Sequence, residues 1–302
     1  MVGIDISICI ATHRRPRQLA QLLTLLVEQE EAPPFEVVVV DNDVARSAET
    51  VIQEFNQRLQ LTYLVEPTRG LSRVRNRTVA ATKSKYLAFI DDDHCAGTRW
   101  LASHYQIETQ TNAAAVIGTT DVVFEKQVPD FIRNCNVFSK KRYSDGEIVP
   151  WYHATTANCF IRRDALPDAS APFSPSFDLT GGEDVDLFYR MVQSGAQLVA
   201  SAQAHTVSYR PASRASLYWV LRRAFRNGGT QVEVAWGPCD WRQKIRRGYN
   251  AAVVGAKHTV KAVWLWRGDK ENGLHRMLQA SEQFGIVVRL CGLRIEEYRH
   301  HH

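Results

Sequence analysis

The first 90 residues alternate short apolar runs with stretches that repeat at the helical period. The apolar runs cover residues 4–10, 35–40, 61–65 and 86–90, and each is short enough for a buried strand. Between them, apolar residues recur at the spacing of one helix face in residues 16–26, 51–55 and 71–80. Strands that alternate with helices in this way form βαβ units around a mostly parallel sheet. The sequence therefore predicts an α/β fold.

Polar side chains stand directly after three of these strands. They occupy residues 11–14 (ATHR), 41–43 (DND) and 91–93 (DDD). In open α/β sheets, ligands bind beyond the carboxyl ends of the strands. We therefore expect the three segments to meet in one crevice that holds the functional site.

The composition is typical of a soluble globular protein, with 45% hydrophobic and 23% charged residues in a chain of 302. No apolar run reaches the ~18 residues that cross a bilayer, and the start lacks a basic segment ahead of an apolar stretch. We therefore expect neither a transmembrane helix nor a secretory signal. The six cysteines lack C-x-x-C spacing, which argues against a zinc site or a disulfide framework and suits a reducing cytoplasm. We expect a cytoplasmic protein.

The second half of the chain is less regular and sets the expected boundaries. Residues 124–153 contain prolines and mixed charges, and we expect a long mobile loop there. After about Pro238 the pattern is helical, without a strand signal. The expected organisation is a main domain over residues 1–237 and a helical extension over residues 238–299. Residues 300–302 are histidines that we interpret as a tag remnant and exclude from the chemistry.

Asp91, Asp92 and Asp93 follow an apolar strand and place three like charges within a few ångströms of one another. Such a cluster is costly unless a cation or hydrogen bonds offset the repulsion. A divalent hard cation does so, and it needs few protein carboxylates when a diphosphate supplies further oxygen ligands. We predict that Asp93 binds the metal, that Asp91 is shared between metal and ribose, and that Asp92 is the most dispensable. The alternative is a solvated acidic loop.

A basic segment precedes the carboxylate cluster. Residues 68–77 contain Gly70 and arginines at positions 69, 73, 75 and 77, where a helix is predicted to begin. Backbone N–H groups and the positive end of the helix dipole favour an anion at such a position. The segment therefore indicates a diphosphate ligand, and the alternative is a solvated basic helix face.

Ordered motifs along residues 4–230 carry a family resemblance. They read ISICIATHRRP, EVVVVDND, EPTRGLSRVRNR, AFIDDD, FDLTGGEDVDLFYR and YWVLRRAFRNGG. Together they resemble family 2 glycosyltransferases of the GT-A fold, especially the bacterial exopolysaccharide branch with succinoglycan-type glucosyltransferases. The resemblance implies a Rossmann-like α/β catalytic domain with a nucleotide-binding half over about residues 1–123 and an acceptor-binding half over about residues 124–237. It also implies inverting transfer of a sugar from a nucleotide sugar, with UDP favoured, to an acceptor hydroxyl.

The resemblance further implies a nucleotide site built from five residues. Thr12 and Arg14 would flank the nucleotide, and Asp41 would accept a hydrogen bond from uracil N3–H. Arg69 and Arg75 would contact the base or the phosphates. Asp41 alone is the reason for favouring UDP over GDP.

Metal binding and the reaction are assigned to other residues by the same resemblance. Asp91 and Asp93 would hold the ribose and Mn²⁺ or Mg²⁺. His205 is a candidate third metal ligand, although a lone histidine is more often structural. Asp184 matches the family's general base, which takes the proton of the acceptor hydroxyl as that hydroxyl attacks the anomeric carbon. The alternative for Asp184 is capping of a helix N-terminus.

Glu183, Trp151 and Arg223 are the predicted acceptor contacts. Residues 221–226 lack the Gln and Trp of the Q-x-x-R-W motif that processive membrane members carry, so we expect one sugar per encounter. The expected acceptor is a glycan or a lipid-linked oligosaccharide in bacterial polysaccharide biosynthesis.

Two other classes of protein fit part of the pattern. A sugar-phosphate nucleotidylyltransferase shares the sheet and the metal carboxylates, but it should carry a glycine-rich G-G-x-G-T-R loop where this chain has ATHRRP. A non-catalytic nucleotide-sugar-binding module needs neither Glu183 nor Asp184.

The carboxy-terminal part is basic and aromatic. Residues 241–268 contain no acidic residue, seven Lys or Arg residues and four Trp or Tyr residues. This pattern is typical of a helix that binds anionic lipid headgroups, and it predicts peripheral attachment at the inner face of a bacterial plasma membrane. The alternatives are a helical hairpin packed on the catalytic domain and an oligomer interface. No other feature supports binding of nucleic acid.

Overall fold

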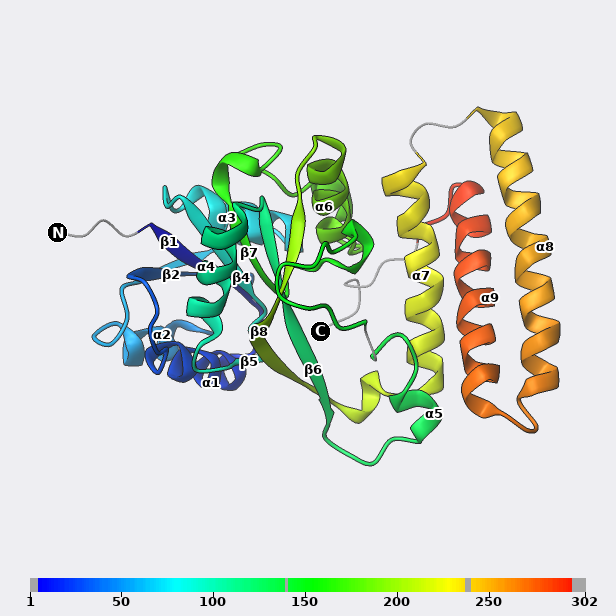
Figure 1. The fold of residues 1–302 in the computed structure, drawn as a ribbon, viewed down its shortest axis with the longest axis horizontal. Helices are drawn as coiled ribbons and strands as arrows, with labels where there is room; N and C mark the ends of the chain where they lie inside the picture. Colours follow the sequence, from blue (N-terminus) through cyan, green and yellow to red (C-terminus); the bar gives the residue numbers. More distant parts are fainter. Residues whose placement is uncertain (1–4, 139–140, 237–239, 295–302) are drawn as a thin grey trace. The chain divides into compact units, whose positions relative to one another are not determined.

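The computed structural model describes residues 5–138, 141–236 and 240–294. This part of the chain contains an eight-stranded sheet with the order β3-β2-β1-β4-β7-β6-β8-β5 (Figure 1). The strands are β1 (Ile6–Thr12), β2 (Phe35–Asp41), β3 (Leu61–Val65), β4 (Tyr86–Ile90), β5 (His94–Ala96), β6 (Ala115–Phe124), β7 (Asn158–Arg162) and β8 (Leu198–Arg210). The four apolar runs of the first 90 residues are β1 to β4, so the predicted α/β fold is confirmed.

The sheet is parallel in one half and antiparallel in the other. β1 pairs in parallel with β2 and β4, and β2 pairs in parallel with β3. β7 is antiparallel to β4 and to β6, and β5 is antiparallel to β8. The prediction of a mostly parallel sheet therefore holds only for the βαβ part. Beyond it, β6 returns to β7 without a long crossover helix, and antiparallel pairing does not need one.

Helices cover both faces of the sheet because side chains alternate along each strand. The helices of this part are α1 (Pro16–Val27), α2 (Glu49–Phe55), α3 (Leu71–Ala80), α4 (Trp100–Thr111) and α6 (Glu183–Gln193). On one face, Ile8 belongs to a core with Leu22 and Trp100, from α1 and α4. On the other face, Cys9 belongs to a core with Phe188 of α6. The carboxyl ends of the parallel strands remain available for a site.

Short 3₁₀ helices occupy Trp151–His153, Arg163–Ala165, Pro175–Phe177 and Ala212–Arg214. Residues 124–153, expected to be one mobile loop, instead contain the end of β6, the helix α5 (Asp130–Arg133) and the first of these 3₁₀ turns. The apolar side chains of Val128, Ile132 and Phe138 are buried in a core, which is why this segment is structured.

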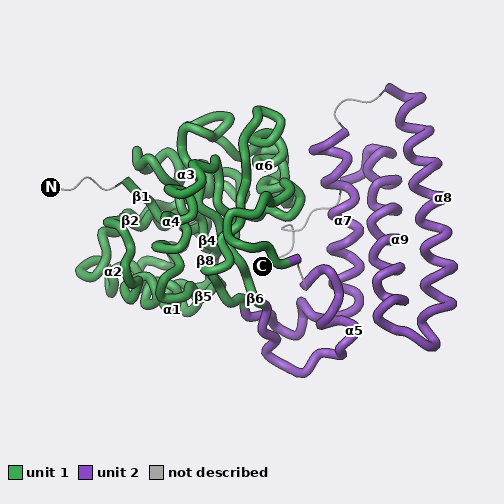
Figure 2. The backbone as a smooth tube through the Cα atoms, viewed as in Figure 1, with its two compact units in different colours: residues 1–121, 142–208 green, residues 122–141, 209–302 purple. Residues whose placement is uncertain are grey.

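The chain forms two compact units, coloured separately in Figure 2. The first comprises residues 1–121 and 142–208, and the second comprises residues 122–141 and 209–302. The second unit contains α5, α7 (Leu217–Ala235), α8 (Trp241–Leu265) and α9 (Lys270–Leu290), with α9 packed against both α7 and α8. Helices at the carboxy terminus were predicted, but this unit starts earlier than the expected boundary. Pro238 and residues 300–302 lie outside the described residues.

Candidate active site

The ends of β1 and β4 are joined by a buried carboxylate. Asp92 is only 4% exposed, and its carboxylate accepts a hydrogen bond from Thr12 Oγ1 at 2.8 Å and from Arg15 Nη1 at 2.8 Å. Burial raises the pKa of Asp92 to about 6, although the nearby positive charge of Arg15 opposes that rise. Asp92, expected to be the most dispensable of the three aspartates, links the two strand ends to each other through these bonds.

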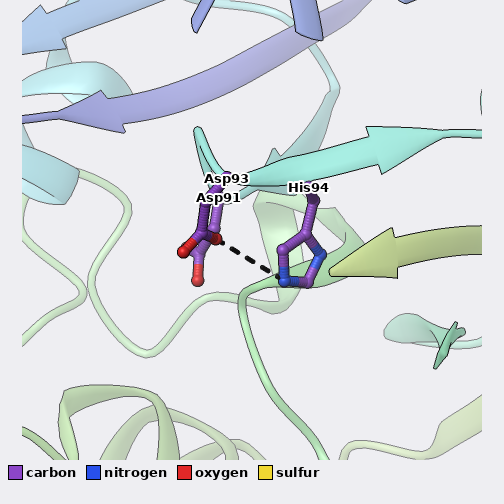
Figure 3. Close-up of side chains that lie close together, drawn as sticks. All are labelled: Asp91, Asp93 and His94. Carbon is purple, nitrogen blue, oxygen red and sulfur yellow. Dashed lines mark ion pairs between the residues drawn. The ribbon is translucent and has the colours of Figure 1, made fainter. Parts of the chain in front are cut away.

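Asp91, Asp93 and His94 form a group that could hold a metal ion (Figure 3). Each offers one ligand atom, and these atoms all lie within 4.8 Å of one another. His94 Nε2 lies 3.9 Å from Asp93 Oδ1, and its ring is buried where β4 turns into β5. Carboxylate oxygens suit Mg²⁺ and Mn²⁺, whereas the imidazole nitrogen suits a softer transition metal better than Mg²⁺. The donor set therefore fits a divalent cation.

Two arginines neutralise these carboxylates. Arg15 Nη1 lies 3.3 Å from Asp93 Oδ2, and Arg75 Nη2 lies 3.1 Å from Asp91 Oδ1. Arg75 also donates to the buried carboxylate of Glu183, and its guanidinium lies over the ring of Phe173. Arg75 therefore links the end of β4 to the start of α6, which brings the predicted base region beside the predicted metal site.

Asp184 stands in the first turn of α6 and is half-buried. Its Oδ2 accepts a hydrogen bond from Thr155 Oγ1 at 3.1 Å. Gly182 stands at the N-cap position of the helix, and its φ of 101° lies in the left-handed region. Asp184 Oδ1 accepts a hydrogen bond from the backbone N–H of Val185 at 2.8 Å, so this carboxylate also satisfies an N–H group of the first turn, as the capping alternative expected.

The predicted nucleotide side is held by hydrogen bonds among β1, β2 and the loops that follow them. Arg14 is half-exposed, and its Nε donates to Asp43 Oδ2 at 3.3 Å. Asp41 is fully buried, and its carboxylate accepts from the backbone N–H groups of Asp43 and Ala48 at 3.0 Å each and from the Tyr63 hydroxyl at 3.1 Å. These bonds hold the carboxylate of Asp41 in a fixed position beneath the loop that follows β2.

Gly70 shapes the turn that leads into α3. Its φ is 149°, and a Cβ at this position would overlap the carboxylate of Asp178. The same carboxylate accepts hydrogen bonds from the backbone N–H of Arg73 at 3.2 Å and from its Nε at 2.8 Å. Arg69, in contrast, is exposed at the start of this turn. The arginines of residues 68–77 thus have separate environments.

The other predicted residues are not members of the metal-competent group. His205, on β8, is not among the clustered ligand atoms, and its Nε2 lies 2.9 Å from Asp121 Oδ2. Trp151 packs edge-on against Tyr189 of α6, with ring centroids 5.1 Å apart. Arg223 belongs to α7 of the second unit, where its guanidinium lies over the ring of Trp219.

Three residues of the site were not predicted from the sequence. They are His94, Arg15 and Thr155. His94 and Arg15 directly adjoin predicted site residues, so the run D-D-D-H and the pair R-R could have indicated them. Thr155 had no such signal, because it approaches Asp184 from 29 positions away in sequence.

Residues 7–168 match the family model of Glycosyl transferase family 2. The chain belongs to this family. Succinoglycan biosynthesis protein ExoM of Rhizobium meliloti (strain 1021) is 31% identical over 309 residues, which cover 98% of this chain and 95% of that protein. Chondroitin synthase of Escherichia coli is 25% identical over 228 residues, which cover 63% of this chain and 32% of that protein. This family 2 glycosyltransferase therefore has relatives in polysaccharide biosynthesis, as its motifs predicted.

Solved structures are similar to it at the level of the fold. The mannosyltransferase PcManGT from Pyrobaculum calidifontis, in complex with GDP-Man and Mn²⁺, has a TM-score of 0.64 at 15% identity and covers 96% of this chain and 88% of that one. S. aureus TarS 1-349, in complex with UDP-GlcNAc, has a TM-score of 0.56 at 15% identity and covers 91% of this chain and 90% of that one. The predicted GT-A architecture is confirmed by these likenesses.

Proposed function

We propose that this glycosyltransferase moves one sugar, with inversion, from a UDP-sugar to an acceptor hydroxyl. The observation that carries the proposal is the link through Arg75, which bonds to Asp91 of the metal-competent group and to Glu183 beside Asp184. This link supports a site in which the proposed general base and the proposed diphosphate-binding group are neighbours, as a displacement at an anomeric carbon requires.

Asp184 is the proposed general base, and Thr155 orients it by donating to Oδ2. Asp184 takes the proton of the acceptor hydroxyl while the oxygen forms a bond to the anomeric carbon. The bond from that carbon to the UDP oxygen breaks, and the electron pair leaves with UDP. Glu183 and Trp151 are proposed to contact the acceptor near this position, and Arg223, on the second unit, is a separate proposed acceptor contact.

Asp91, Asp93 and His94 are the residues proposed to hold Mn²⁺ or Mg²⁺. Such a cation, when bound, neutralises charge that develops on the departing diphosphate. Arg15 and Arg75 already offset the carboxylate charge, so they keep the group assembled before a cation arrives. Manganese in the complex of the similar mannosyltransferase supports the choice of metal. His205 remains a weaker candidate, because its ring nitrogen lies beside Asp121.

Nucleotide binding is proposed for Thr12, Arg14, Asp41, Arg69 and Arg75, and ribose binding for Asp91. UDP and UDP-GlcNAc occupy the S. aureus relatives, whereas the mannosyltransferase holds GDP-Man. UDP is proposed here on the resemblance at Asp41. The buried hydrogen bonds of Asp41 also shape the loop over residues 41–48, so its replacement should weaken nucleotide binding by either route.

The acceptor is proposed to be a glycan or a lipid-linked oligosaccharide. The sequence alignment with a succinoglycan biosynthesis protein spans nearly all of both chains, which supports a role in bacterial exopolysaccharide formation. Among the described residues, no helix combines the length and the apolar character that crossing a bilayer requires. Peripheral attachment at the inner face of the plasma membrane is the corresponding proposal for where the enzyme acts.

Replacing Asp184 by Asn tests the transfer. We expect Asp184→Asn to bind UDP-sugar normally and to lose about 10²–10⁴-fold in turnover, because the amide cannot accept the proton. Asp164→Asn makes the same chemical change at a carboxylate that is exposed on the surface, and should leave turnover unchanged. Transfer at the normal rate by Asp184→Asn would sink the base assignment.

The metal and the nucleotide are tested by thermal shift with a panel of nucleotide sugars, with and without Mn²⁺. A ligand that binds only the native state raises the melting temperature. UDP-sugars with Mn²⁺ should give the largest rise, and His94→Ala should lose the Mn²⁺-dependent part while His205→Ala keeps it. If His205→Ala lost the Mn²⁺-dependent rise and His94→Ala kept it, the third metal ligand would be His205 rather than His94.

A further inference from the structure

α8 is a long helix with only one packed face. It packs against α9, and its buried residues are small: Ala251, Gly255 and Ala262. A Cβ at Gly255 would lie 3.1 Å from the Phe284 ring, so the two helices approach closely along this face. The opposite face of α8 has no comparable packing partner among the described elements.

Large apolar side chains project from the unpacked side of α8. They are Trp241, Ile245, Tyr249, Val260, Val263 and Trp264, each between 63% and 79% exposed. Steps of four, four, eleven and three residues separate the first five, and Trp264 directly follows Val263, which places most of them along one side of a helix. An apolar row of this size on a water-exposed helix is unusual unless it contacts another surface.

Positive charge surrounds this apolar row. Arg242, Arg246, Lys257, Lys261 and Arg267 are exposed, and residues 241–268 contain no Asp or Glu. On a helix stabilised by exposed ion pairs, both signs of charge alternate. A single sign of charge beside exposed aromatic rings instead complements an apolar surface that carries negative charge.

We infer that the outer face of α8 is a docking surface for the anionic headgroup region of a lipid bilayer. The helix lies in the plane of the interface, with Trp241, Tyr249 and Trp264 among the headgroups and acyl chain ends and with the arginines and lysines against lipid phosphates. This inference rests on the proposed function, because a lipid-linked acceptor would be presented at the surface of a bilayer. It adds the residues that make the contact.

Vesicle co-sedimentation of the full chain tests the docking surface. Vesicles of phosphatidylcholine with phosphatidylglycerol should bind the protein at low salt, and tryptophan emission should shift to the blue. Vesicles of phosphatidylcholine alone should bind it weakly, and added salt should release it because exposed charges are screened. The two variants Tyr249→Ser/Trp264→Ser and Arg246→Glu/Lys257→Glu should each weaken binding about tenfold or more.

A matched control reverses two charges elsewhere. Lys83→Glu/Lys126→Glu changes the net charge as much as the α8 charge variant does, at two exposed lysines outside α8, and it should keep most of the vesicle binding. If both charge variants weaken binding equally, overall charge rather than α8 attracts the protein, and the inference fails. Equal binding to neutral and anionic vesicles would overturn it as well.

Two other occupants of the surface give different results. Binding to a single-stranded oligonucleotide without binding to anionic vesicles would overturn the inference, and so would a stable dimer that Tyr249→Ser/Trp264→Ser converts to monomer. Sugar transfer to a soluble acceptor distinguishes failure of the docking inference from failure of the proposed function. The α8 variants should retain that transfer, whereas Asp184→Asn should lose it whether or not vesicles bind.

Discussion

Asp92 is a carboxylate held inside the protein by two donors. Thr12 reaches it from β1, and Arg15 reaches it from the segment that leads into α1. Burial of a carboxylate favours its protonated form, and the pKa of about 6 shows that these donors offset the cost of burial only in part. Asp92 therefore lowers stability when ionised, while it fixes the position of its two neighbours in the metal-competent group.

The raised pKa of Asp92 predicts a pH-dependent stability. Between about pH 4 and pH 6 the native state holds a proton that the unfolded state has released, because the pKa rises from 3.8 to about 6. The stability from this proton is complete below about pH 4 and is lost as pH rises through about 6. The difference in unfolding free energy, wild type minus Asp92→Asn, should therefore fall by about 2 kcal/mol from about pH 4 to about pH 7.

Urea denaturation at a series of pH values measures this difference. Asp164→Asn is the control, because its carboxylate is exposed, and its difference from wild type should change little with pH. A constant difference between wild type and Asp92→Asn across this range would show that Asp92 is ionised at all of these pH values in the native state.

Single residues of the site could be predicted from the sequence where the residues next to them indicated their role. Asp91 and Asp93 were recognised because they follow a buried strand, and the structure places both in the metal-competent group. The bond from Arg75 to Glu183 could not be predicted, because 108 positions separate the two residues and only the packing of α6 brings them together. Such long-range pairs depend on the tertiary fold rather than on spacing in sequence.

At the scale of elements, glycines determine how closely α7 and α9 pack. A Cβ at Gly285 of α9 would overlap the backbone carbonyl of Phe225 in α7, and one at Gly228 of α7 would overlap the carbonyl of Glu282 in α9. Backbone atoms cannot move aside as a flexible side chain can. The two helices therefore need glycine at both positions to keep their present distance.

Gly285→Ala should lower the free energy of unfolding by about 1–3 kcal/mol, because the clash outweighs the helix propensity that alanine gains. Gly248→Ala is the matched control in α8, where a Cβ would lie 3.8 Å from Leu290 Cδ1 in ordinary contact. That change should raise stability by about 0.5–1 kcal/mol. Chemical denaturation measures the change in unfolding free energy of each variant. If both variants were more stable than wild type, or both less stable, the role given to Gly285 would be contradicted.

Elements were predictable in proportion to the regularity of their pattern. β1 to β4 and the helices between them have short apolar runs and clear helical periods, and all were predicted. The antiparallel direction of β7 was not predicted, because direction depends on the route of residues 125–157. Val128, Ile132 and Phe138 fix that route, because they are buried in a core with residues of α7 and α9, which come much later in the sequence.

At the scale of the whole molecule, the two units are interleaved in sequence. Residues 122–141 leave the first unit, join the second, and return before β7. Their buried side chains pack with Val220 of α7 and with Leu274 and Leu278 of α9. A single cut in the chain therefore cannot separate the two units cleanly.

Truncation after residue 237, the boundary expected from the sequence, tests this interleaving. It removes Leu274 and Leu278 and leaves Val220 and the buried part of residues 122–141 facing water. Exposed apolar surface of this kind promotes aggregation and binds hydrophobic dyes. We expect the truncated chain to be poorly soluble and to bind such a dye strongly, whereas removal of residues 300–302 alone should change neither property. If the truncated chain is soluble, binds no extra dye and transfers sugar at the normal rate, then residues 1–237 fold as an independent domain and the interleaved description is wrong.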